Sequence, residues 1–181
     1  MEKKLVMMSG GIAHTAFGGI GLGYFLKVEP ILTALGVSVV AAVAVAAGKR
    51  RAMTDSDLLI GMFWSLGMAM GVVFIALTPG YPPDTASYLF GNILAVSRAD
   101  LKLILGLDVL VVLTVCSLFQ AFKAYIFDEE FSSVAGVPVR LLEYLLFVLV
   151  AVTVVILIRV VGIILVIALL TAPPAIAKQN S

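Results

Sequence analysis

Long apolar stretches with few charges recur along the whole chain. The segment between Lys4 and Lys27 carries no formal charge, and neither does the stretch from Leu58 to Thr78. A helix needs about 20 apolar residues to cross the hydrocarbon layer of a bilayer. Of the 181 residues, 62% are hydrophobic, which leaves too little polar surface for a soluble domain. We therefore expect an all-α, polytopic membrane protein with a single transmembrane domain over residues 1–181.

The lengths of these stretches predict about six transmembrane helices. In chain order, the expected spans are 5–26, 30–47, 58–78, 101–122, 139–158 and 160–177. The last two share one apolar stretch, in which Arg159 and Gly162 mark the reversal. Arg159 and Glu143 lie near span ends, where long side chains can snorkel to water, so we interpret both as anchors.

The basic residues predict the orientation, because Lys and Arg are favoured on the cytoplasmic side of a membrane. With a cytoplasmic N-terminus, the inner segments hold Lys3, Lys4, Lys49, Arg50, Arg51, Lys123, Arg140 and Lys178. The outer segments then hold only Lys27, Arg98, Lys102 and Arg159. We therefore expect a cell-membrane protein with both termini of this chain in the cytoplasm.

Two connections are too long to be simple turns. On the outer side, "TPGYPPDTASYLFGNILAVSRAD" predicts a short helix from Thr85 to Val96. On the inner side, the segment 124–138 contains Asp128, Glu129 and Glu130, which suit the first turn of a short helix because negative charge there complements the helix dipole. Gly136 suits the C-terminal cap of that helix, and Pro138 suits the stop after it.

His14 is the one histidine of the chain, and it lies in the apolar, glycine-rich stretch "GGIAHTAFGG". Helical spacing places Gly10, Gly11 and Gly18 beside it. A row of small residues, which includes Thr15 and Gly19, lets another helix approach closely in lipid. We expect His14 either to bond a neighbouring helix or to face a pathway as a ligand for Zn, Mn or Fe. As a ligand it needs a partner from another helix or another subunit.

Asp108 lies inside the fourth predicted span. A carboxylate at that depth is costly unless it is paired or hydrated, so it should face protein or water. One hypothesis makes it a metal or proton ligand. The other satisfies it with a nearby Ser or Thr, or with Lys102 one turn away, and we favour the second.

Four segments resemble the ABC-3 permeases, the membrane subunits of bacterial and archaeal importers for zinc, manganese and iron. "MSGGIAHTAFGGIGLGYFL" resembles the histidine-motif helix of that family, and "SYLFGNILAVSRADL" its outer segment. "FDEEFSSVAGVPVRLLE" is similar to its cytoplasmic coupling region, and "RVVGIILVIALLTAPPAIA" to its late helix. The four segments occur in the family's order and extend over nearly the whole chain.

The resemblance implies a permease subunit that forms a pathway with a second copy of itself. Separate ATPase subunits would bind and hydrolyse ATP, and an outer binding protein would deliver the metal. The metal would be cargo, with no tightly bound cofactor. The ATPase would dock on a coupling helix whose residues include Asp128, Glu129, Glu130, Phe131, Ala135 and Gly136. The other interpretation of that segment is an ordinary solvated loop.

Two departures from the family pattern concern the ligands and the length. The family has an aspartate four residues before the histidine and a serine directly before it, where this chain has Gly10 and Ala13. Family members also have further spans before the histidine helix and after the late helix. We therefore expect a fragment, a chain counted from an internal start, or a shortened relative.

The chain has no Gly-rich loop ending in Gly-Lys-Ser or Gly-Lys-Thr and no Ser-His-Asp or His-Glu-x-x-His arrangement. We therefore expect a transport subunit rather than an enzyme, with no nucleic-acid partner. Two alternatives stay open: an ATP-independent carrier or channel with six spans, and a permease fragment that does not transport.

Overall fold

The computed structural model describes residues 2–52, 56–80, 85–93 and 96–179, and all regular structure in these ranges is helical. This confirms the predicted all-α fold. The described residues form eight helices: α1 (Glu2–Leu26), α2 (Pro30–Ala52), α3 (Ser56–Leu77), α4 (Thr85–Phe90), α5 (Arg98–Ser117), α6 (Phe119–Phe127), α7 (Glu129–Val134) and α8 (Val139–Gln179).

Three helical segments of the described chain are both long and apolar enough to cross a membrane. They are Pro30–Lys49 in α2, Leu58–Leu77 in α3 and Val139–Leu170 in α8. The bent pair of α5 and α6 makes a fourth if it forms one span. The glycine-rich α1 has 25 residues and is not among these segments. The described residues thus give three or four candidate spans of a multi-pass membrane protein, and the predicted count of six is not confirmed.

The fourth predicted span, 101–122, is not one straight helix. α5 ends at Ser117, and α6 continues at 68° to it. The bend lets Phe122 and Tyr125 of α6 pack in a small core with Leu142 and Leu149 of α8. α5 has no buried residue, so a straight continuation would gain little apolar burial. Burying the rings of Phe122 and Tyr125 stabilises the bent arrangement more.

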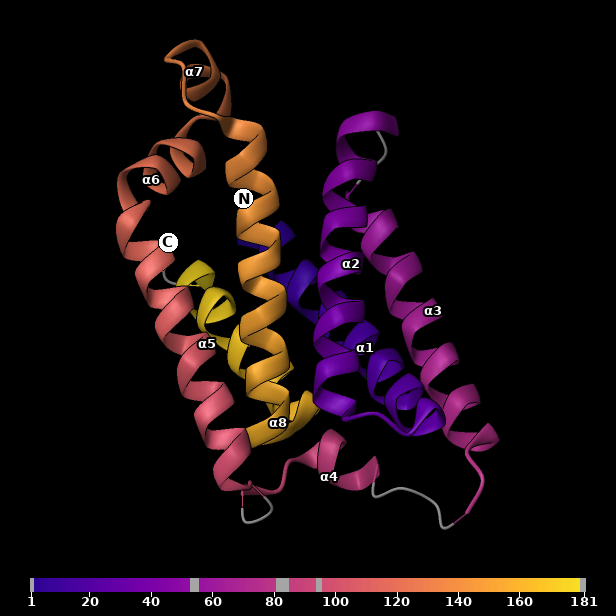
Figure 1. Ribbon diagram of the computed structural model, residues 1–181. Coiled ribbons are helices and arrows are strands. Elements are labelled where there is room, and N and C mark those ends of the chain that lie inside the picture. The colour runs from indigo at the N-terminus through magenta and orange to yellow at the C-terminus, as the bar shows by residue number, and fades with distance from the viewer. Residues whose placement is uncertain (1, 53–55, 81–84, 94–95, 180–181) are drawn as a thin grey trace.

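α8 breaks at Gly162, which has a φ of 79° and a ψ of 163°. In Figure 1 the orange part of α8 runs down the molecule, and its yellow end turns back after the break. Gly162 is one of the two residues expected to mark a reversal in this stretch. Positive φ is readily accessible to glycine and unfavourable for residues with a Cβ, so the sequence locates this break well.

The helix α4 is shorter than the predicted helix 85–96, since it ends at Phe90. Gly91 stops it with a φ of 83°. A Cβ added to Gly91 would lie 2.5 Å from the carbonyl carbon of Val161, beside the break in α8. Residues 94 and 95 of the predicted helix lie outside the described ranges.

The main core gathers on α1, which packs most extensively against α3, then against α2, and also against α8. Figure 1 shows α1, α2 and α3 as one group beside a second group of α5, α6 and the first part of α8. The fully buried side chains of this core include Met8, Ile20, Val154 and Ile158. The helix that carries the histidine is therefore central to the fold.

Candidate functional site

His14 lies on α1 and stacks on Trp64 of α3. The two ring centroids are 4.3 Å apart, and the ring planes differ by 19°. The side chain is half-buried, and its Nδ1 atom is buried with no hydrogen-bond partner among the described residues. The imidazole thus has an aromatic partner for its face and a free nitrogen at its edge.

The glycines around His14 are contact points between helices. A Cβ on Gly10 would lie 3.3 Å from Cζ3 of Trp64. A Cβ on Gly18 would lie 2.7 Å from the carbonyl oxygen of Gly67 on α3, and one on Gly19 would lie 2.6 Å from Cα of Ala34 on α2. In this chain, Trp64 fills the space next to Gly10.

Two further small-residue positions also touch α3. A Cβ on Gly11 would overlap the side chain of Ile60. Thr15 donates its hydroxyl to the carbonyl oxygen of Gly11 at 2.8 Å and lies 3.2 Å from that of Phe63 on α3. Bonding to the carbonyl four residues back satisfies a hydroxyl that would otherwise be costly in an apolar core.

Asp108 is exposed on α5, a helix with no buried residue. α5 packs against α8 and α6, whereas α1 packs against α3, α2 and α8. The structure therefore does not bring the two predicted metal-binding residues, Asp108 and His14, together. No group of three or more His, Cys, Asp or Glu side chains within the described ranges could hold a metal ion.

α7 is a short helix with both ends capped. At its N-terminus, the Asp128 carboxylate accepts a hydrogen bond from the Phe131 amide at 2.9 Å. At its C-terminus, Val137 N donates to Ser132 O at 3.0 Å, and Gly136 has a φ of 80°. This 6→1 bond with a left-handed glycine is the Schellman motif. The acids and Gly136 thus correctly predict a short helix with a glycine at its C-terminal end.

The surface of α7 combines apolar and acidic side chains. Phe131 is 69% exposed and Val134 is 88% exposed. Asp128 and Glu130 are exposed beside them, as is Ala135 after the last turn. Large apolar side chains that are this exposed at a helix tip are typical of a surface that binds a partner.

Glu143 is not the hydrated anchor that the sequence suggested. Its side chain is 0% exposed and forms an ion pair with Lys49 near the end of α2. The same ammonium lies 4.0 Å from Glu129 at the start of α7. The carboxylate is buried because α2 and α8 pack side by side here, which replaces water with a lysine partner.

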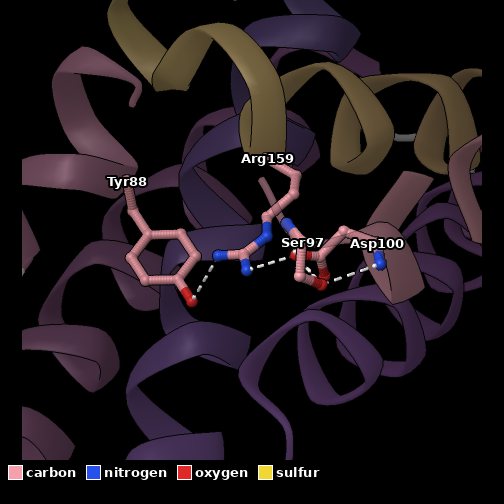
Figure 2. A network of polar contacts seen from close by, with 4 residues as sticks. All are labelled: Tyr88, Ser97, Asp100 and Arg159. Carbon is pink, nitrogen blue, oxygen red and sulfur yellow. Dashed lines mark hydrogen bonds and ion pairs between the residues drawn. The ribbon is translucent and has the colours of Figure 1, made fainter. Parts of the chain in front are cut away.

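A second polar network lies at the opposite end, where Arg159 joins α8 to α4 and α5 (Figure 2). Its guanidinium donates to the Asp100 carboxylate at 2.7 Å and to the Tyr88 hydroxyl at 3.2 Å. Asp100 also accepts from the backbone N–H of Ser97 at 2.9 Å, while Ser97 caps α5. Arg159 is thus a paired residue 20% exposed rather than a snorkelling anchor.

Sequence reasoning missed Tyr88, Ser97, Asp100 and Lys49. One signal was present, because "SRAD" has the spacing of a capping box, with an acid three residues after a serine. No comparable signal pairs Lys49 with Glu143, which are 94 residues apart in the chain.

Comparison with known proteins gives a consistent picture. The ABC 3 transport family matches residues 1–181. An uncharacterized membrane protein of Synechocystis sp. is 46% identical over 97% of this chain and 63% of its own length. The manganese transport system membrane protein MntC of Halalkalibacterium halodurans is 31% identical over 97% of this chain and 60% of its own.

A solved structure is similar as well. The structure of PsaBC from Streptococcus pneumoniae in complex with Fab aligns with a TM-score of 0.78 and 30% identity, over 96% of this chain and 62% of that one. The chain thus spans about 60% of the length of the relatives that it matches. The resemblance drawn from the four sequence segments is confirmed: the chain belongs to the ABC 3 transport family.

Proposed function

We propose that this chain is a membrane-spanning part of an importer for divalent metal ions that is driven by a separate ATPase. The observation that carries the proposal is the match of a transport family over the whole chain. Manganese is the first candidate cargo, because the MntC relative is a manganese transport protein by name. Zinc and iron(II) are the alternatives that suit the same imidazole.

The ends of the helices support a cytoplasmic α7. Lys49 contacts Glu129 of α7, and Arg140 lies in the first turn of α8, so two basic residues of the predicted inner set lie at that end. Arg159 of the predicted outer set lies at the other end, beside Tyr88 of α4. This separation agrees with the positive-inside rule and favours both termini in the cytoplasm.

We propose that α7 is the coupling helix on which the ATPase docks. Its exposed Phe131 and Val134 would enter an apolar groove of the ATPase. The caps at both ends keep the helix rigid, so that a push on α7 moves the spans instead of unwinding it.

We further propose that His14 contributes to the metal pathway. Its free Nδ1 supplies one ligand, and one imidazole alone is a weak site. Further ligands would come from a second copy of the chain across a pathway between two permeases, or from an outer metal-binding protein as it delivers the ion. The ion would therefore be held briefly and then released.

Co-purification and uptake test the proposal together. The native permease should co-purify with an ATPase subunit, and Phe131→Asp should abolish this, while Lys123→Asp on the neighbouring α6 should not. Cells with the intact transporter should take up Mn(II), in competition with Zn(II) or Fe(II). Uptake without any ATPase would instead establish an ATP-independent carrier. If the native subunit has the intact mass of these 181 residues and the cells take up no metal, the chain is a permease fragment that does not transport.

A further inference from the structure

Lys49 connects three helices through one side chain. It lies near the end of α2, forms an ion pair with Glu143 of α8, and lies 4.0 Å from Glu129 at the start of α7. α7 otherwise packs on its chain neighbours α6 and α8. The Glu129–Lys49 contact therefore gives α7 a link to α2, a helix that is distant in sequence.

The two ion pairs of Lys49 differ in strength. Glu143 is completely buried, so its ion pair with the nearby ammonium is shielded from water. Glu129 is 39% exposed and more distant, and water and salt weaken such a pair. Lys49 is thus fixed to α8 and bound to α7 through a contact that can open and close.

We propose that Lys49 is a positioning residue that passes the displacement of α7 to the spans. The inference rests on the proposed function, because it requires an ATPase that moves α7. From Lys49 the displacement enters α2, which packs along α1, the helix that carries His14. Without the Glu129–Lys49 contact, α7 would still dock on the ATPase, but this contact would no longer transmit its displacement to α2.

The test compares Glu129→Gln with Glu130→Gln in the intact importer, reconstituted in vesicles. The described acids in contact with Lys49 are Glu129 and Glu143, so Glu130→Gln removes the same charge from the same helix without touching this link. We measure Mn(II) transported per ATP hydrolysed. Glu129→Gln should lower that ratio about two- to fivefold relative to Glu130→Gln, the factor expected for a partly hydrated ion pair.

Equal ratios in the two variants would overturn the inference while leaving the proposed function intact. Loss of ATPase assembly in Glu129→Gln alone would also overturn it, since Glu129 would then be a docking residue. Failure of the unmodified importer to hydrolyse ATP or move metal would instead reject the proposed function.

A double-mutant cycle separates this role from a purely structural one. Lys49→Met/Glu143→Leu removes both charges of this ion pair, and Lys49→Arg keeps the cation. Lys49→Met/Glu143→Leu should lower the Mn(II) transported per ATP hydrolysed, as Glu129→Gln does. Lys49→Arg should keep the ratio of the unmodified importer. Adding Glu129→Gln to the Lys49→Met/Glu143→Leu background should lower the ratio no further. A further drop there would show that Glu129 acts through another partner, and the inference would fail.

Discussion

The guanidinium of Arg159 lies 2.7 Å from the carboxylate of Asp100, a residue 59 positions earlier in the chain. This pair ties the part of α8 just before its break to the first turn of α5. The two side chains are 20% and 11% exposed, so the pair is shielded from solvent more than a surface ion pair is.

Asp100→Asn tests that pair without removing the helix cap, since an asparagine oxygen can still accept from Ser97 N. We expect a loss of about 1.5–3 kcal/mol, the usual contribution of a hydrogen bond to a charged group. Thermal unfolding of the purified protein in detergent measures it. Lys102→Gln, an exposed change on the same helix, is the control. Equal midpoints for the two variants would mean that the pair does not stabilise the fold.

Glycine substitutions should fall into three tiers. Gly162→Ala should be the most damaging, because the new Cβ meets both a left-handed φ of 79° and the backbone of Gly91. Gly136→Ala has a φ of 80° and open space around it, so it should cost only the conformational term of about 1–2 kcal/mol. Gly106→Ala lies in an open part of α5 and should stabilise by up to about 1 kcal/mol.

The yield of folded protein and its unfolding midpoint rank this glycine series. If Gly162→Ala were as stable as Gly106→Ala, the break in α8 would not depend on the left-handed glycine.

His14→Phe separates the two interpretations of the histidine. Phenylalanine keeps the stack on Trp64 but has no ring nitrogen. We expect normal stability and at least an order-of-magnitude loss of Mn(II) uptake, because a pathway ligand is gone. His14→Ala also removes the stack and should in addition cost about 0.5–1.5 kcal/mol. Full uptake by His14→Phe would assign the histidine to packing alone.

Lys49→Met should destabilise the fold by about 3–5 kcal/mol, because the buried Glu143 carboxylate loses the Lys49 ammonium. Lys49→Met/Glu143→Leu should recover most of this loss, since neither charge then remains in the interior. Denaturant or thermal unfolding of both variants measures the difference. A double variant as unstable as the single one would show that the ion pair is not the reason for the loss.

Features governed by local chemistry were predictable from the sequence. The caps of α7 follow from Asp128 and Gly136, and the break in α8 follows from a glycine inside a long apolar stretch. The bend after Ser117 was missed because no proline or glycine marks it. It depends on where Phe122 and Tyr125 find a surface to bury, which is a tertiary property.

The polar pairs illustrate the same limit. Glu143 and Arg159 lie near the ends of apolar stretches, and position alone suggests that such residues reach for water. Only the packing of α2 on α8, and of α4 and α5 beside the break in α8, reveals that each has a protein partner. In the same way, the sequence shows glycines beside His14 but not that Trp64 fills the space next to Gly10.

The contact between Gly91 and Gly162 joins peptide backbone to peptide backbone. Side chains at an interface can absorb a small shift by changing rotamer, but a peptide plane has no rotamers. A movement of α8 at its break should therefore displace the end of α4 by a similar amount. Because neither residue has a side chain, the turn after α4 and the break in α8 are coupled directly through their backbones.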